Sequence, residues 1–193
     1  PYRTFNPMDL ISNLTGAIIG TIIISFFIPS LKNKQATTGN WMRDFTLKMY
    51  EFLLDILAAN GYNFQTVEDF VISPLSKVVI LRHDIDKMPL NALKFAKLEK
   101  SKEIYSTYYF RIVPDSFVPS IIREISAIGH NIGYHYEDVD LSKGDIDKAY
   151  ISFQKNLEKL RKIAPVKTIC MYWSPLSKYD NRKLWDKCNY REE

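Results

Sequence analysis

The residues with the clearest capacity for chemistry follow a short apolar run. Val78–Leu81 is followed at once by Arg82, His83, Asp84 and Asp86. The apolar run fits a buried strand, and charges at the end of such a strand need ion-pair or metal partners. Asp84 and Asp86 are two residues apart, so on a strand they face the same side. One could bind a metal while the other acts as a base. The alternative is a strand that runs into a turn, with Asp86 capping the next helix.

A second cluster lies further along the chain. The segment Gly129-His130-Asn131-Ile132-Gly133-Tyr134-His135 holds two of the three histidines, and Glu137 and Asp138 follow it. His135 and the two acidic residues stand near the end of a predicted strand. Mixed histidine and carboxylate ligands suit zinc or another borderline divalent metal. The alternative is that His130 caps the preceding helix and that His135 is a buried residue with satisfied hydrogen bonds.

Together the two clusters resemble the NodB-like polysaccharide deacetylases, the carbohydrate esterase 4 group, over about residues 42–193. That family has an Asp-bearing motif at the end of its first strand and, one βα unit later, a segment similar to Gly129–His135. The resemblance implies a distorted β/α barrel and metal-dependent deacetylation of an N-acetylated sugar in a glycan or glycan precursor.

The resemblance also implies roles for single residues. It implies Asp84 as the catalytic base and Asp86 and His135 as ligands of a divalent metal, and the roles of the two aspartates could be exchanged. Zinc is the expected metal, with cobalt, manganese or nickel as alternatives. The residues expected to contact the substrate are Arg82, His83 and Tyr134.

The chain departs from the family pattern at several positions. Its first motif is His-Asp-Ile-Asp, as in an atypical subgroup, rather than two adjacent aspartates. Val139 stands where the family usually has a second histidine, and Tyr172 where the subgroup often has one. Glu137 or Asp138 could therefore supply the third ligand. The family's catalytic acid has no counterpart before Glu193, so we expect an incomplete catalytic domain.

These departures leave a second function open beside the deacetylase. The chain could be a non-catalytic relative that binds glycans or acts as a scaffold, with a degenerate metal site. A third reading, an unrelated α/β enzyme that uses Asp84 and Asp86 with magnesium and phosphate, lacks a Gly-rich phosphate loop.

The elements around the two clusters alternate between helices and strands. Apolar residues at helical spacing predict helices over 42–60, 89–104, 118–128 and 146–163. Runs rich in aromatic and β-branched residues predict strands over 106–113, 131–137 and 168–173, after the strand that begins at Val78. This alternation predicts an α/β fold with a parallel sheet, either open or closed into a barrel.

The first residues have a different character. No charged residue occurs from Leu10 to Leu31, a length that predicts one membrane-spanning helix within a segment 1–31. The alternative is a buried helix of a soluble domain. The stretch 3–20 resembles the last membrane helix of VanZ-like proteins. A polar linker, 32–41, follows. Lys and Arg residues are more frequent after the span than before it, which predicts that the remaining chain lies in the cytoplasm.

Composition limits the other function classes. A net charge of +4 over 193 residues is too small and too dispersed to indicate nucleic-acid binding. The two cysteines, Cys170 and Cys188, form neither a disulfide framework nor a CxxC metal motif, which favours a reducing compartment. The expected partners are therefore a carbohydrate substrate and, through the first helix, the membrane.

Overall fold

The computed structural model describes residues 46–173 and 177–187. All of them belong to one compact unit. The predicted membrane helix within 1–31 and the linker 32–41 lie outside the described residues. Among the residues that are described, no helix is long and apolar enough to cross a membrane.

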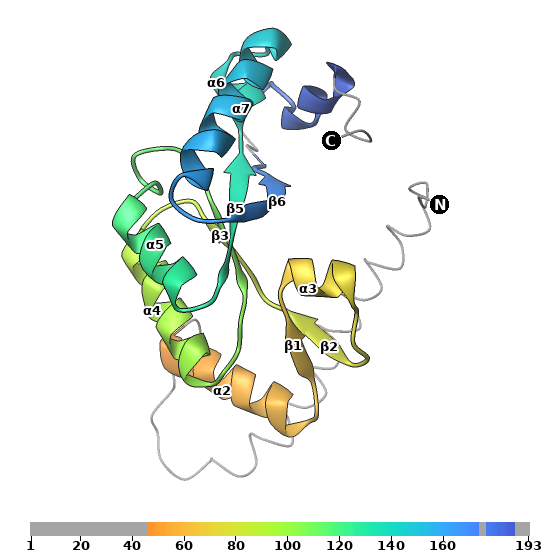
Figure 1. The fold of residues 1–193 in the computed structure, drawn as a ribbon, viewed down its shortest axis with the longest axis vertical. Coiled ribbons are helices and arrows are strands. Elements are labelled where there is room, and N and C mark those ends of the chain that lie inside the picture. The colour runs from red at the N-terminus through yellow and green to blue at the C-terminus, as the bar shows by residue number, and fades with distance from the viewer. Residues whose placement is uncertain (1–45, 174–176, 188–193) are drawn as a thin grey trace. The chain divides into compact units, whose positions relative to one another are not determined.

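A four-stranded parallel sheet forms the centre of the fold (Figure 1). Its strands are β3 (Arg82–Ile85), β4 (Thr107–Phe110), β5 (Asn131–Tyr136) and β6 (Val166–Met171), which lie side by side in chain order. The predicted α/β class with a parallel sheet is thereby confirmed. In the part of the chain that the structure describes, the strands do not close into a barrel.

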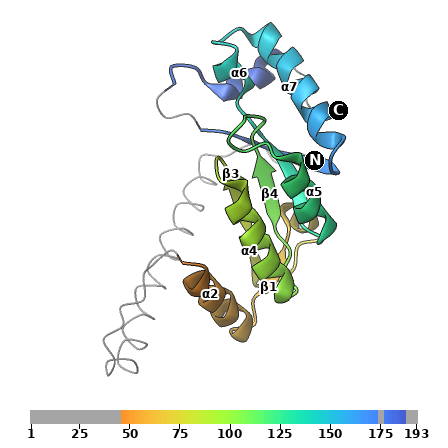
Figure 2. The ribbon, with the colours of Figure 1, turned by 90° about the vertical axis from the view of Figure 1, so that its left-hand side faces the viewer.

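Helices connect these strands, and three of them, α4 (Pro89–Ser101), α5 (Pro119–Ala127) and α7 (Ile146–Arg161), cover one face of the sheet. The short α6 (Asp138–Leu141) follows the end of β5 and packs against α7. Helices α4 and α5 both begin with proline, whose fixed φ suits the first helical position, and they lie side by side against the sheet (Figure 2). The core between helices and sheet includes Ala96, Ile122, Ile125 and Phe153 from the helices and Tyr108, Phe110, Ile132 and Tyr134 from the strands.

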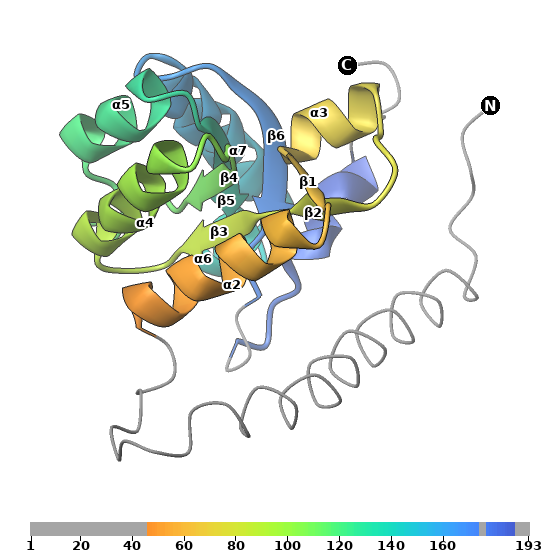
Figure 3. The ribbon, with the colours of Figure 1, turned by 90° about the horizontal axis from the view of Figure 1, so that it is seen from below.

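A smaller sheet of two strands adjoins the larger one. Its strands β1 (Asn63–Gln65) and β2 (Val78–Ile80) pair in parallel. The predicted strand that begins at Val78 therefore divides at Leu81: β2 pairs with β1, whereas β3 pairs with β4. Helix α2 (Leu47–Ala59) precedes β1. Helix α3 (Val67–Ile72) lies on the side of the larger sheet that faces away from α4 and α5 (Figure 3).

Side chains of the larger sheet alternate between its two faces, as pleated strands require. One face packs against the helices and carries the apolar core. The other face is polar and carries Asp84, Tyr109, Gly133, His135 and Cys170. The candidate site is built on this polar face.

Candidate metal centre

The carboxyl ends of the strands bring candidate ligands together. Asp84 of β3 lies level, across β4, with Gly133 of β5. His135, two residues further along β5 and on the same face, pairs directly with Cys170 of β6. Asp86 follows the end of β3. One potential ligand atom from each of Asp84, His135 and Cys170 lies within 4.8 Å of the other two, so these residues form a possible metal-binding triad.

Gly133 gives the ring of Tyr109 the space to lie across β5. A Cβ atom at this position would lie 2.3 Å from two ring carbons of Tyr109 and 3.1 Å from the backbone oxygen of Thr168. The ring reaches β6, where the Tyr109 hydroxyl donates a hydrogen bond to Thr168 Oγ1 at 3.0 Å. The glycine therefore allows Tyr109 of β4 to lie across β5 and to bond β6, which links three strands next to the candidate ligands.

His135 is prepared as a metal ligand by its own hydrogen bond. Its side chain is only 4% exposed, and Nδ1 lies 3.2 Å from the carbonyl oxygen of Cys170. Because a carbonyl oxygen can only accept, this contact assigns the proton to Nδ1 and leaves a lone pair on Nε2. Nε2 lies 3.9 Å from Asp84 Oδ2 and 3.8 Å from Asp86 Oδ1. Metal-binding histidines commonly hold their second nitrogen in this way.

Asp86 has a carboxylate oxygen without a hydrogen-bond partner. Among the described residues, its Oδ1 is the one buried side-chain nitrogen or oxygen in that condition. An unsatisfied buried polar group costs about 1–3 kcal/mol, and more if it is charged. The Asp86 side chain as a whole is 48% exposed, so a cation or a water molecule can reach its carboxylate group. Asp86 does not cap the next helix, since α4 has Met88 at its cap position and no side-chain capping bond.

Asp84 is held by Arg82 of the same strand. Arg82 Nε donates to Asp84 Oδ1 at 2.8 Å, and Nη2 donates to Oδ2 at 2.6 Å. The same Nη2 also donates to the sulfur of Cys170. The hydrogen bond to Asp84 raises the pKa of Arg82. Burial raises the pKa of the Cys170 thiol, and the positive charge of Arg82 opposes that rise.

The triad fits a small divalent cation. A carboxylate, an imidazole and a thiolate are all zinc ligands, at about 2.0–2.3 Å from the metal. Ligands at that radius in a tetrahedral site lie roughly 3.3–3.8 Å apart, which separations of up to 4.8 Å can reach by small side-chain shifts. Nitrogen and sulfur donors favour zinc or cobalt over magnesium or calcium.

The other two predicted ligands are engaged elsewhere. Glu137 is almost completely buried and accepts two hydrogen bonds from Arg111, at 2.7 and 2.6 Å. Asp138 is fully buried on the helix side, where it accepts hydrogen bonds from Tyr134, Ser152 and Asn156. Because the protein already satisfies both carboxylates, neither belongs to the cluster.

Two of the predicted substrate contacts face the helices instead. His83 stacks on Tyr108, with ring centroids 4.5 Å apart, and lies 2.6 Å from Glu99 Oε1. Tyr134 is 1% exposed and donates its hydroxyl hydrogen to Asp138. Both side chains therefore lie behind the sheet, away from the cluster. Of the three residues predicted to contact the substrate, only Arg82 is part of the polar face.

A buried carboxylate, Glu99, organises the network behind the sheet. It accepts hydrogen bonds from the side chains of Tyr50, His83, Ser106 and Tyr108. His130 lies beside it, accepts the Ser106 backbone N–H on Nδ1 and donates from Nε2 to the Ala96 carbonyl. Burial lowers the pKa of His130. His130 is thus a satisfied buried residue and not a ligand.

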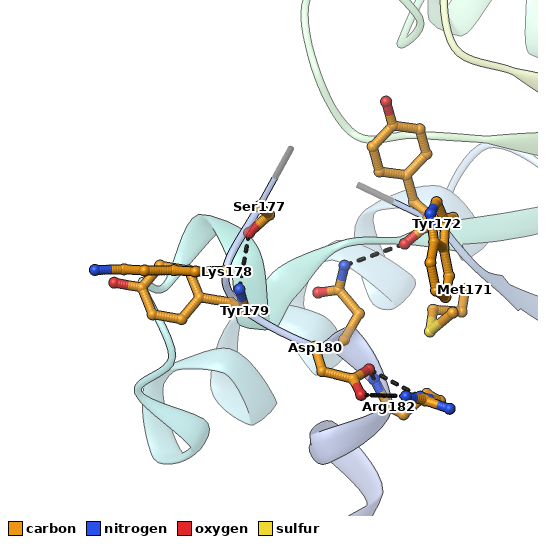
Figure 4. Close-up of a pocket in the computed structure, with 9 residues that line it drawn as sticks. Met171, Tyr172, Ser177, Lys178, Tyr179, Asp180 and Arg182 are labelled. Atoms are coloured by element: carbon orange, nitrogen blue, oxygen red, sulfur yellow. Dashed lines mark hydrogen bonds and ion pairs between the residues drawn. The ribbon is translucent and has the colours of Figure 1, made fainter. Parts of the chain in front are cut away.

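A pocket adjoins the cluster through Tyr172, whose ring stands edge-on to His135 at 5.3 Å between centroids. Residues 171–173 after and at the end of β6 form one wall, and residues 177–182, which lead into the 3-10 helix η1 (Asn181–Lys187), form the other (Figure 4). Asn181 joins the two walls by donating to the Tyr172 carbonyl at 3.2 Å. The pocket therefore presents aromatic and polar side chains next to the candidate metal site.

Cys170 is the candidate ligand that the sequence reasoning missed. Its position near the end of the predicted strand 168–173 was the available signal, since the other candidates also stand at strand ends. A lone cysteine without a CxxC partner gave no further indication. Its partnership with His135 depends on the register between β5 and β6.

Comparisons with known proteins leave the family of the chain open. No family model matches the chain, and no curated protein or solved structure matches it.

Proposed function

We propose that the chain is a metal-dependent carbohydrate deacetylase of the NodB-like type. Its reaction would be hydrolysis of the amide bond of an N-acetylated sugar in a glycan or glycan precursor. The observation that carries the proposal is the bare Nε2 of buried His135, which lies 3.9 and 3.8 Å from the carboxylates of Asp84 and Asp86. A divalent metal such as zinc, bound there, would polarise the amide carbonyl and lower the pKa of a water molecule.

The two aspartates divide the remaining work in one of two ways. In the assignment that follows the motif, Asp86 and His135 hold the metal, and Asp84 accepts the proton of the attacking water. The two hydrogen bonds from Arg82 then orient the Asp84 carboxylate. In the exchanged assignment Asp84 is the ligand and Asp86 Oδ1, which has no hydrogen bond, is the base. Either carboxylate would need to come within about 2.6–3.2 Å of the water.

The pocket beside Tyr172 supports a sugar as the substrate. Tyr172, Trp173 and Tyr179 give it aromatic surface, which suits the C–H faces of a sugar ring, and Ser177 and Asp180 give it hydrogen-bonding groups. Arg111 lies over the Tyr172 ring, 4.0 Å from its centroid, and Glu137 fixes the guanidinium by two hydrogen bonds. A sugar in this pocket would lie next to His135, where the reaction would take place.

The finer architecture is part of the same proposal. Strands β3 to β6 each pair with the next strand of the chain, which is the order of a β/α barrel. Barrel closure and a catalytic acid would require strands beyond those described. The apolar segment 1–31, with its VanZ-like pattern, would anchor the domain to the membrane, and the catalytic part would face the cytoplasm.

One observation favours a second candidate, a non-catalytic glycan-binding or scaffolding relative. Val139, at the position of the expected second histidine, is 1% exposed and packs in the core. Glu137 and Asp138 are engaged by Arg111 and by helix residues, so neither replaces that histidine. A site that lacks the second histidine in this way is what we would expect of a chain that binds a sugar in the pocket without hydrolysing it.

Metal binding and acetate release together test the proposal. The thermal unfolding of the purified chain is measured with and without Zn²⁺, for the parent, His135→Ala and the exposed control Asp115→Asn. At a metal concentration of a hundred times the dissociation constant, the free energy of unfolding of the parent and of the control should rise by about 2.7 kcal/mol. That of His135→Ala should not change. Acetate release from N-acetylglucosamine oligomers by the metal-loaded parent would support the deacetylase.

The other outcomes separate the candidates. Stabilisation by Zn²⁺ with retention of the oligomers and no acetate release would favour the non-catalytic relative. A well-folded parent that Zn²⁺ does not stabilise would contradict the metal site and, with it, the proposed reaction.

A further inference from the structure

The potential ligands that lie together at the candidate metal site differ from those that the sequence motifs imply. Among the described residues, Asp84, His135 and Cys170 form the one group of three whose potential ligand atoms all approach one another within 4.8 Å. Asp86 comes close to His135 but does not belong to that group. The geometry thus favours a different third ligand from those that the sequence indicated.

We propose that Cys170 binds the metal as a thiolate together with Asp84 and His135, and that Asp86 is the base. This inference rests on the proposed function, because it names the ligands and the base of the same site. On metal binding the Cys170 S–H bond breaks, its proton passes to solvent and the sulfur keeps the electron pair for the metal.

The first support is the positive charge of the Arg82 guanidinium, which lies between two of the proposed ligands. Arg82 Nη2 donates both to Asp84 Oδ2 and to Cys170 Sγ, so one positively charged group bridges two of the three ligands. A metal ion that replaces it leaves neither ligand without a positive partner. Arg82 can turn away, because its side chain is 44% exposed. The guanidinium carbon also lies over the Tyr109 ring, 5.2 Å from its centroid, so part of the environment of Arg82 is a cation–π contact and not a ligand.

The second support is the coupling between the histidine and the cysteine. His135 and Cys170 are register partners on adjacent strands, and His135 Nδ1 donates to the Cys170 carbonyl oxygen. The hydrogen bond directs the lone pair of Nε2 of this 4% exposed side chain toward the carboxylates. Both ligands are thereby held on rigid strands rather than on loops, which favours a preformed site.

The third support is the state of Asp86. Its Oδ1 is buried, has no hydrogen bond and lies 3.8 Å from His135 Nε2. A general base needs a free lone pair next to the reacting water. Asp84, in contrast, has both oxygens hydrogen-bonded by Arg82, so fewer of its lone pairs are free to take a proton.

Titration of the full chain with Co²⁺ tests the ligand set without an activity assay. A thiolate bound to Co²⁺ produces a near-ultraviolet charge-transfer band, which carboxylate and imidazole ligands do not produce. The proteins are the parent, Cys170→Ser, Asp84→Asn and Asp86→Asn. The control is Cys188→Ser, which removes the other cysteine of the sequence. Far-UV circular dichroism checks that each variant folds.

The expected result has four parts. The parent and Cys188→Ser show the band, and Cys170→Ser loses it. Cys170→Ser and Asp84→Asn bind Co²⁺ at least roughly 10- to 100-fold more weakly, the range that even outer-sphere changes produce. Asp86→Asn keeps the band and its affinity. In the parent, Co²⁺ also slows alkylation of Cys170, a readout that needs no variant and remains valid if Cys170→Ser does not fold.

Four results would overturn the inference. Co²⁺ binding without the band, with full affinity in Cys170→Ser, would exclude the thiolate and leave the proposed deacetylase intact with Asp86 and His135 as ligands. Loss of the band in Cys188→Ser alone would assign it to the other cysteine. Loss of binding in Asp86→Asn with retention in Asp84→Asn would reverse the aspartate roles. No Co²⁺ binding by the folded parent would overturn both this inference and the proposed function.

Discussion

Replacement of Glu99 by glutamine is expected to destabilise the fold strongly, although the two side chains have the same shape. Glu99 is fully buried. Its Oε1 accepts from Tyr50 and His83 at 2.5 and 2.6 Å, and its Oε2 accepts from Ser106 and Tyr108 at 2.6 and 2.8 Å. The amide nitrogen of glutamine cannot accept a hydrogen bond, so two of these donors lose their acceptor.

The number of hydrogen bonds lost sets the expected decrease in the free energy of unfolding. A hydrogen bond to a charged group contributes about 1.5–3 kcal/mol, so the loss of two amounts to about 3–6 kcal/mol. The hydroxyls of Ser106 and Tyr108 can rotate and accept from the amide, which places the expected loss near 3 kcal/mol. In a chain of this size each 1 kcal/mol lowers the melting temperature by about 2–4 °C, so we expect a fall of about 6–12 °C.

Urea denaturation followed by far-UV circular dichroism measures this loss. The matched control is Glu124→Gln on α5, where the side chain is 46% exposed and pairs with Lys97 at the surface. Removal of such a surface pair costs less than about 1 kcal/mol. If Glu99→Gln were no less stable than Glu124→Gln, the buried network would not contribute as the structure indicates, and the reasoning would be refuted.

The same carboxylate predicts a dependence of stability on pH. Burial acts to raise the pKa of Glu99, but the hydrogen bonds from His83, Ser106 and Tyr50 outweigh it and lower the pKa below the ordinary value of 4.5. The unfolded chain then binds the proton more readily, so this stabilisation is complete above about pH 5 and is lost as the pH falls through the folded pKa. The stability difference between the parent and Glu99→Gln should shrink in that window. A constant difference would contradict the role of the charge.

Two further substitutions test the supports of the candidate site. Arg111→Ala leaves the buried Glu137 carboxylate without its partner, so we expect the free energy of unfolding, measured by urea denaturation, to fall by about 3–5 kcal/mol. The double variant Arg111→Ala/Glu137→Gln should restore part of this loss. A loss below about 1 kcal/mol in the single variant would contradict the expectation. Gly133→Ala places a methyl group 2.3 Å from the Tyr109 ring, and we expect a loss of about 1–3 kcal/mol from overpacking. Because Tyr109→Ala removes the clash, the two substitutions should be non-additive in a double-mutant cycle, and strict additivity would argue against this contact.

Local sequence patterns determined most of the secondary structure and the edge of the sheet at which the candidate site lies. The predicted helices 118–128 and 146–163 agree closely with α5 (Pro119–Ala127) and α7 (Ile146–Arg161), since apolar periodicity is a local property. Asp84, Asp86 and His135 could be grouped in advance, because a buried strand carries charges only at its ends. The strand from Val78 was predicted as one element, and its division depends on pairing with two different partners.

The partners of each predicted site residue were decided by tertiary structure. Glu137 is neutralised by Arg111, which follows the neighbouring strand, and Asp138 is satisfied by Ser152 and Asn156 of α7. These contacts join residues that are separate in the sequence, so no local pattern contains them. Strand alternation explains why His83 lies behind the sheet while the adjacent Asp84 lies on the polar face.

The sequence by itself thus determined the α/β alternation and the carboxylates and histidine at the strand ends. Only the tertiary structure decided that Cys170 joins them. The register between β5 and β6 shifts by one residue between Ile132 and Gly133, so that His135 pairs with Cys170. Without this irregularity His135 would pair with Ile169, and the cysteine would lie beside Tyr136. A slip of one residue moves every later side chain to the opposite face. The third candidate ligand therefore depends on a bulge that packing across two strands fixes.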